Sequence, residues 1–143
     1  MSNPINLVCP ACGVTNRIPA ERTADHPKCG KCGDPLFNGH PTELTGANFG
    51  KHISRNGIPV LVDFWAPWCA CRMMAPAFAQ AAAQMEPQVR FAKLNTEDHQ
   101  MIGAQYGIRS IPTMALFRDG KEIGRISGAM GAADIVRWVN SQL

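Results

Sequence analysis

The 143-residue chain has no long hydrophobic run. Its longest apolar stretch, residues 58–68, is interrupted by Pro59, Asp63 and Pro67, and no segment reaches the roughly 20 apolar residues of a membrane-spanning helix. The first twenty residues also lack a continuous apolar run, so they do not resemble a secretory signal. We therefore expect no membrane association, and we expect the protein in the cytoplasm, where thiols are kept reduced.

The sequence also lacks a strong excess of either charge. Fourteen Lys and Arg residues stand against eleven Asp and Glu, and the resulting net charge of +3 is too small to argue for a nucleic-acid partner. Internal repeats and low-complexity tracts are missing as well. Apolar residues make up 45% of the chain and charged residues 17%, which excludes wholesale disorder and allows one ordinary domain with a small appendage.

Two CxxC pairs stand near the N-terminus, Cys9-Pro-Ala-Cys12 and Cys29-Gly-Lys-Cys32, with sixteen residues between them. Two residues between thiols let one tight turn aim both sulfurs at a single metal ion, and two such pairs complete a tetrahedral zinc site. We predict one structural Zn²⁺ per chain in a zinc ribbon over residues 1–36, whose hairpin includes a strand at residues 14–18. The alternatives are a pair of disulfides or four unrelated buried thiols.

The predicted ribbon carries a net charge of only +1 and no interleaved aromatic residues. This is too little positive charge to neutralise the phosphates of a nucleic acid. A segment this small buries too little apolar surface to fold without its metal. The ribbon is therefore interpreted as a metal-dependent folding unit rather than a nucleic-acid-binding module.

Residues 37–143 have the length of a single domain and alternate between strand and helix patterns. The predicted elements are a helix at 49–53, a strand at 59–65, a helix at 71–85 kinked at Pro76, a strand at 89–95, a helix at 99–106, a hairpin of strands 113–117 and 122–127, and a helix from Ala132. This order predicts an α/β fold with a mixed central sheet and helices on both sides.

Three stretches of this region resemble signature sequences of the thioredoxin family: residues 60–69 (VLVDFWAPWC), residues 71–76 (CRMMAP) and residues 111–113 (IPT). The resemblance covers residues 40–143. With the four-cysteine segment in front, the chain is similar to the zinc-finger thioredoxins of bacteria, the thioredoxin 2 group. The resemblance implies a thioredoxin fold, disulfide exchange with protein substrates, and thioredoxin reductase as a partner. We expect a monomer.

The sequence departs from the family at the reactive centre, where Trp-Cys-Gly-Pro-Cys is shortened to Trp68-Cys69-Ala70-Cys71. Helical phase keeps Cys71 in step with the apolar positions that follow, so the approach of Cys69 must change. Helical residues two apart are offset by about 200°, and a Cys69–Cys71 disulfide therefore requires a tight turn before the helix. Because strain in such a bridge raises its reduction potential, we expect a more oxidising couple than in ordinary thioredoxin.

Cys69 is the candidate nucleophile, since a thiolate at the start of a helix is stabilised by the helix dipole and by unpaired N–H groups. Cys71 would then resolve the mixed disulfide. An ionised carboxylate is costly inside an apolar strand. The resemblance implies that Asp63 is the family's buried acid, which accepts the Cys71 proton through water, and that Lys93 is its partner.

The resemblance further implies a cis peptide bond between Ile111 and Pro112, next to the cysteines. Its role would be to expose backbone for strand-like pairing with a substrate chain. Trp68 would form part of an apolar rim around this site.

Each of these assignments has an alternative that the residues leave open. Cys69 and Cys71 could be inert thiols, Asp63 a surface residue at a strand end, Lys93 a solvated lysine, and Trp68 a core residue. For the whole chain, one alternative is a [2Fe–2S] cluster or another metal bound by Cys69 and Cys71 across a dimer, since such a cluster needs four ligands. Another is a redox-inactive binding domain. The four histidines form no motif, and we expect all of them at the surface.

Overall fold

The computed structural model describes residues 4–68 and 73–143 of the chain. In chain order the elements are β1 (Pro4–Val8), β2 (Thr15–Pro19), the short 3-10 helix η1 (Ala20–Arg22), β3 (Thr42–Leu44), α1 (Phe49–Arg55), β4 (Val60–Trp65), α2 (Ala75–Met85), β5 (Arg90–Asn95), α3 (Gln100–Gln105), β6 (Thr113–Arg118), β7 (Lys121–Ser127) and α4 (Ala132–Gln142). Within these described ranges, no helix is both long enough and apolar enough to cross a membrane.

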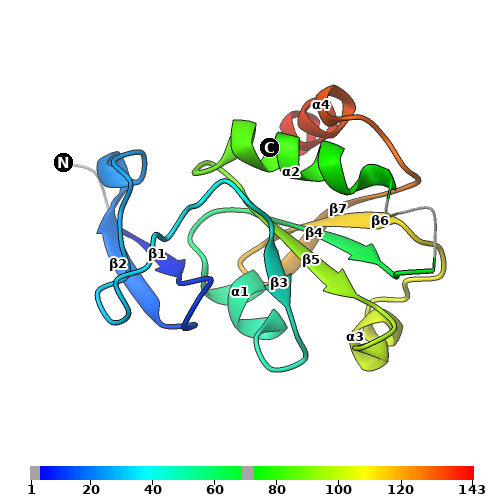
Figure 1. Cartoon of the computed structure of the whole chain (residues 1–143), viewed down its shortest axis with the longest axis horizontal. Helices are drawn as coiled ribbons and strands as arrows, with labels where there is room; N and C mark the ends of the chain where they lie inside the picture. The colour runs from blue at the N-terminus through cyan, green and yellow to red at the C-terminus, as the bar shows by residue number, and fades with distance from the viewer. Residues whose placement is uncertain (1–3, 69–72) are drawn as a thin grey trace.

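The central sheet has five strands in the order β3-β5-β4-β6-β7. β3, β5 and β4 run parallel to one another, whereas β6 is antiparallel to β4 and β7 is antiparallel to β6. Helices α2 and α4 cover one face, and α1 and α3 lie against the other (Figure 1). The predicted mixed sheet with helices on both sides is confirmed.

The apolar pattern of β4 explains its central position. Its residues are almost all buried because both faces are covered, as a continuous apolar strand predicts. Residues of odd number, such as Leu61, pack towards α2 and α4 with Phe78 and Phe91, whose ring centres are 5.0 Å apart. Residues of even number, such as Phe64, pack towards α1, where the ring of Phe49 lies 6.2 Å away.

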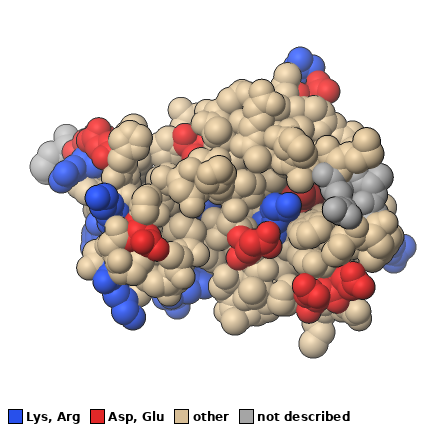
Figure 2. Space-filling view, viewed as in Figure 1, with Lys and Arg blue, Asp and Glu red and all other residues tan. Residues whose placement is uncertain are grey.

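A second, two-stranded sheet lies beside the first and consists of the antiparallel hairpin β1-β2 (Figure 1). β2 is close to the predicted strand at 14–18, but its partner β1 was not predicted, and neither was the edge strand β3. On the face shown in Figure 2, blue and red side chains are interspersed over this hairpin region, so neither sign forms a continuous field there.

Two expectations are wrong. Pro76 does not kink the interior of a helix, because α2 begins at Ala75 and the proline lies in the first turn, where its missing N–H costs no hydrogen bond. His52 is not at the surface: it lies on α1 with 1% of its area exposed, and among the described residues its Nδ1 has no hydrogen-bond partner. Burial, with Arg90 and Lys51 nearby, lowers the pKa of His52 to about 4.

The hairpin region is attached to the main sheet by a buried arginine at the start of β5. Arg90 is fully buried, and its Nη2 donates to the carbonyl oxygens of Leu36 at 2.7 Å and Val8 at 3.4 Å. Its guanidinium lies 4.5 Å from the ring centre of Phe37 and 3.7 Å from the buried carboxylate of Glu86. The positive charge of Arg90 is therefore stabilised by the N-terminal region, through two carbonyl groups and an aromatic ring, and by the main domain, through the Glu86 carboxylate. A buried charge needs such partners.

The end of α1 supplies the second attachment. Asn56 accepts a hydrogen bond from the N–H of Val8 at 2.8 Å and donates to the carbonyl of His52 at 2.8 Å. The N–H of Gly57 donates to Asn6 O at 2.6 Å. A Cβ atom at Gly57 would lie 3.1 Å from Ile5 Cβ and 3.2 Å from Asn6 N, so a larger residue would push the hairpin away by a few tenths of an ångström.

Candidate functional site

The four N-terminal cysteines lie in two knuckles of matching geometry. In the first, Cys9 N donates to Val14 O at 2.9 Å and Gly13 N donates to Cys9 O at 3.0 Å. In the second, Cys29 N donates to Asp34 O at 2.8 Å and Gly33 N donates to Cys29 O at 3.0 Å. Both glycines have φ near +80°, which a residue with a side chain rarely adopts. The first knuckle is itself the loop of the β1-β2 hairpin.

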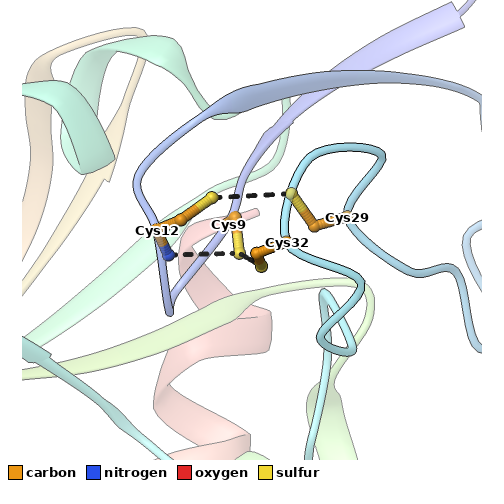
Figure 3. A group of neighbouring side chains, drawn as sticks. All are labelled: Cys9, Cys12, Cys29 and Cys32. Carbon is orange, nitrogen blue, oxygen red and sulfur yellow. Dashed lines mark hydrogen bonds between the residues drawn. The ribbon is translucent and has the colours of Figure 1, made fainter.

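The sulfur atoms of the two knuckles converge on one point (Figure 3). The Cys9 and Cys32 sulfurs are 3.6 Å apart, as are those of Cys12 and Cys29, and all four lie within 4.8 Å of one another. A disulfide would need about 2.05 Å. Four thiolates around Zn²⁺, each with a Zn–S distance of about 2.3 Å, lie about 3.8 Å from one another in a tetrahedron. The cluster therefore fits zinc and excludes the two-disulfide alternative in this structure.

The cysteines of each knuckle differ in environment. Cys9 and Cys29, the first of each pair, are buried, and Cys12 and Cys32 are exposed. The Cys9 sulfur accepts the N–H groups of Ala11 and Cys12, each at 3.4 Å. The Cys29 sulfur accepts Lys31 N–H at 3.4 Å and the side-chain amide of Asn16 at 3.5 Å. Hydrogen bonds from Cys32 N–H, Asn16 and Lys31 N–H lower the pKa of Cys29 to about 6, whereas the pKa of Cys32 is raised, despite a backbone hydrogen bond from Asp34, by burial and by the neighbouring thiols.

The predicted redox cysteines, Cys69 and Cys71, lie outside the described residues. The described part of the predicted site begins with Asp63, in the middle of β4. Only 1% of its area is exposed, and its Oδ1 has no hydrogen-bond partner within the described ranges. Burial raises the pKa of Asp63 to about 7, although the nearby Lys93 acts in the opposite direction. The alternative of a surface aspartate at a strand end is therefore wrong.

Lys93 lies directly opposite Asp63 in the pairing of β4 with β5, so the two side chains share the face covered by α2. It is half-buried rather than fully solvated. Its Nζ lies 4.6 Å from the ring centre of Trp65, a distance at which the ring face attracts a cation. This contact between Trp65 and Lys93 was not predicted, because it joins residues 28 positions apart that only the parallel pairing brings together.

The other predicted binding residues lie in loops. Trp68 is 72% exposed, so it does not pack in the core. The Ile111–Pro112 bond is cis, as the resemblance implied. The Thr113 hydroxyl donates to Ser110 O at 2.6 Å and lies 2.9 Å from the Ser127 hydroxyl, which ties this loop to the end of β7. No sequence signal marks these hydroxyl contacts.

Comparisons with known proteins agree with this division of the chain. A family model described as Thioredoxin matches residues 40–141, and one described as Thioredoxin 2, N-terminal matches residues 8–34. Thioredoxin C-3 of Corynebacterium nephridii is 46% identical over 138 residues, which cover 96% of this chain and 94% of that protein. Thioredoxin 1 of Synechococcus elongatus is 42% identical over 101 residues, covering 70% of this chain and 94% of that protein.

The thioredoxin of Pyropia yezoensis is 39% identical over 103 residues, covering 71% of this chain and 96% of that protein. The match with the Corynebacterium protein extends over nearly the whole chain, including the four-cysteine region, whereas the other two are shorter. With a five-stranded mixed sheet and a four-cysteine N-terminal segment of the thioredoxin 2 type, this chain belongs to the thioredoxin family of protein-disulfide oxidoreductases.

Proposed function

We propose that the chain exchanges disulfides with protein substrates through Cys69 and Cys71, at a potential more oxidising than that of ordinary thioredoxin. The observation that carries the proposal is the family match over residues 40–141 together with a cysteine pair that follows β4, where the family has its redox motif. The buried acid of β4, Asp63, supports it, because a carboxyl group with 1% of its area exposed, whose Oδ1 has no hydrogen-bond partner among the described residues, is costly inside a sheet.

In the reductive direction, the Cys69 thiolate attacks one sulfur of a substrate disulfide. A bond forms between Cys69 and that sulfur, the substrate S–S bond breaks, and the other substrate sulfur leaves as a thiolate that takes up a proton. The Cys71 thiolate then attacks the Cys69 sulfur, which releases the second substrate sulfur. Two electrons and two protons pass to the substrate, and the Cys69–Cys71 disulfide remains.

Asp63 is proposed as the proton acceptor for Cys71 in the second step. A carboxyl group with a pKa of about 7 exchanges a proton readily near neutral pH. Lys93 would stabilise the ionised carboxylate from the neighbouring strand, and its own ammonium group is held over the face of Trp65.

Substrate binding is proposed at the loops that carry Trp68, Ile111 and Pro112. The exposed indole of Trp68 offers apolar contact area, and the loop at Ile111 and Pro112 would pair its backbone with an extended substrate segment. Regeneration by a thioredoxin reductase follows by analogy with the family, and a monomer suffices for every step. The cytoplasm remains the expected compartment.

The shortened motif is the reason for the proposed potential. A single residue between the cysteines makes the disulfide harder to close, and each 1.4 kcal/mol of strain raises the potential by about 30 mV. A redox titration of the zinc-saturated protein, with the 69–71 peptide followed by thiol trapping and mass spectrometry, measures this directly. The matched control replaces Ala70 with Gly-Pro to restore the family spacing.

We expect a more positive midpoint for the chain with Cys69-Ala70-Cys71 than for the Gly-Pro variant. A midpoint equal to or below that of the variant contradicts the strain argument. Cys69→Ser must abolish dithiothreitol-dependent insulin reduction. Retained turnover would contradict the proposed nucleophile, and a protein that never forms the 69–71 disulfide would contradict the exchange mechanism.

For the N-terminal segment we propose one structural Zn²⁺ per chain, held by Cys9, Cys12, Cys29 and Cys32. The supporting observation is the convergence of the four sulfurs at tetrahedral spacing. Metal analysis of the purified protein should return one zinc per chain, and Cys9→Ser should reduce it strongly. Zinc content unchanged by Cys9→Ser would contradict this ligand set.

A further inference from the structure

The two cysteine knuckles are matched in their backbone hydrogen bonds but not in their support. The first knuckle is closed by the hairpin from which it arises, since β1 and β2 pair along their full length up to Val8 and Thr15. The second knuckle has no such hairpin: residues 23–41, all described, contribute no strand to either sheet, and an isolated bridge pairs Lys28 with Pro35. Arg90 links the flanks of the two knuckles at Val8 and Leu36, and a second side chain links the knuckles themselves.

The side chain of Asn16, on β2, makes that connection. Its Oδ1 accepts the N–H of Gly30 at 2.9 Å, inside the second knuckle. Its Nδ2 donates to the sulfur of Cys29 at 3.5 Å and to Val14 O, at the end of the first knuckle, at 3.3 Å. One half-buried side chain therefore touches the backbone of both knuckles and one of the metal-binding sulfurs.

The chemistry of these contacts selects an amide. Gly30 presents a donor, whereas the Cys29 sulfur and the Val14 carbonyl present acceptors, so the side chain must offer an acceptor at one end and a donor at the other. Aspartate would satisfy Gly30 but would turn a second oxygen towards the thiolate, and leucine would satisfy neither. The orientation of the amide is likewise determined by its neighbours.

We propose that Asn16 is a positioning residue of the zinc site, which holds the Cys29 sulfur and the second knuckle at the distance from the first that zinc requires. The inference rests on the proposed zinc binding by the four cysteines. Groups that hydrogen-bond to metal ligands commonly change metal affinity by about 10- to 100-fold when removed, because the ligands lose their orientation. Asn16 does this for the knuckle that lacks a hairpin of its own.

The test is a zinc titration of the full chain in competition with a chromophoric chelator. We expect Asn16→Ala to weaken zinc binding by about 10- to 100-fold and to speed zinc release, with one zinc per chain still bound at saturation. Asn16→Asp should weaken binding at least as much, because it keeps the acceptor for Gly30 but places negative charge beside the thiolate. Asn6→Ala, an exposed asparagine on the facing strand, is the matched control and should bind as wild type does.

The outcomes separate this inference from the zinc proposal itself. Wild-type protein that binds no zinc would overturn both. Wild-type protein that binds zinc while Asn16→Ala binds it equally tightly would overturn the role of Asn16 alone. Wild-type affinity in Asn16→Asp would show that the bond to Gly30 suffices and would overturn the contact with the sulfur. A loss in Asn6→Ala as large as in Asn16→Ala would also overturn the inference, because it would reflect general destabilisation of the hairpin.

Discussion

The cysteine-bearing hairpin region and the five-stranded sheet are stabilised by different means within one chain. Around the hairpin the fully buried cluster consists of Leu7, Cys9, Cys29 and Leu36, so half of its members are the candidate metal ligands themselves. The main sheet has an apolar cluster on each face, with paired aromatic rings such as Phe78 and Phe91. The difference fits the proposed zinc site, because a bound metal can take the place of a core where the chain is too short to build one.

The junction between the two regions is stabilised in a third way, by hydrogen bonds between buried polar groups. Arg90 comes from the main sheet, but its Nη2 hydrogen bonds go to carbonyl groups of the N-terminal region, at Val8 and Leu36. Asn56 likewise turns its acceptor towards Val8. These hydrogen bonds give the junction a specific geometry that apolar contact alone would leave less well determined.

Removing the metal should have the largest effect, and should affect the two regions unequally. Zinc binding contributes on the order of 10–16 kcal/mol in small zinc-dependent domains. We expect chelation to unfold β1-β2 and both knuckles while β4 and β5 keep their amide dispersion in ¹H–¹⁵N spectra. Loss of protection in β4 to the same degree would break the comparison, and restoration of the hairpin on adding zinc is the control.

The second-largest effect is expected from a substitution that leaves a cavity in the core of the main sheet. Phe78 is fully buried against Phe91, and Phe78→Ala should lower the free energy of unfolding of the sheet by about 3–5 kcal/mol in urea titrations. Zinc affinity should stay unchanged, because the hairpin region does not depend on this core. The matched variant in the other region is Leu7→Ala, which should leave the sheet transition nearly unaltered. The reverse pattern would contradict the division.

The junction is tested by Arg90→Ala. Removal of the guanidinium leaves the Val8 and Leu36 carbonyls without their donor and takes away the cation that lowers the pKa of Glu86, and we expect a loss of about 3 kcal/mol in the free energy of unfolding. Arg90→Met combined with Glu86→Gln removes both charges and should recover part of the loss. If Arg90→Ala is neutral, the junction contributes little, and the two regions are merely tethered.

The effect that is smallest near neutral pH is a pH dependence at His52, close to the junction. The pKa of His52 is about 4 in the folded protein and about 6.5 when unfolded, so the unfolded chain binds a proton that the native protein does not. Stability therefore falls as the pH drops through this window. His52→Gln should remove that part of the pH dependence, seen as a wild-type-minus-variant difference that grows in favour of the variant between pH 6.5 and pH 4. A difference independent of pH would contradict the burial of a neutral imidazole.

Most of the main fold was predictable because its signals are local. The alternation of apolar runs with helical periodicity predicted the order of strands and helices, and the Asp119-Gly120 turn predicted the β6-β7 hairpin. β3 was missed because three residues are too short to show a period. β1 was missed because its partner strand lies across the first knuckle, where the turn is defined by cysteine spacing rather than by a hairpin sequence.

The residues of the candidate sites also fall into two groups: those that a local sequence pattern indicated, and those whose contacts only the tertiary structure shows. The CxxC spacings alone indicated which four sulfurs converge, since two intervening residues restrict a turn to few shapes. The interruption of an apolar strand drew attention to Asp63, and the family resemblance implied that it is a buried acid. The contacts of Asn16 with Gly30, and of Trp65 with Lys93, carry no local pattern, because each joins residues that are far apart in sequence.

Composition and spacing thus predicted a four-cysteine metal site near the N-terminus, followed by an α/β sheet with a cysteine pair after its central strand. The tertiary structure decided which residues distant in sequence contact one another. It determines which carbonyl groups accept hydrogen bonds from Arg90, that the imidazole of His52 is buried and neutral, and that the Asn16 amide contacts the second knuckle. The physical reason is that spacing and periodicity act over a few residues. Desolvation and hydrogen bonding between distant segments, in contrast, depend on which surfaces the completed fold brings together.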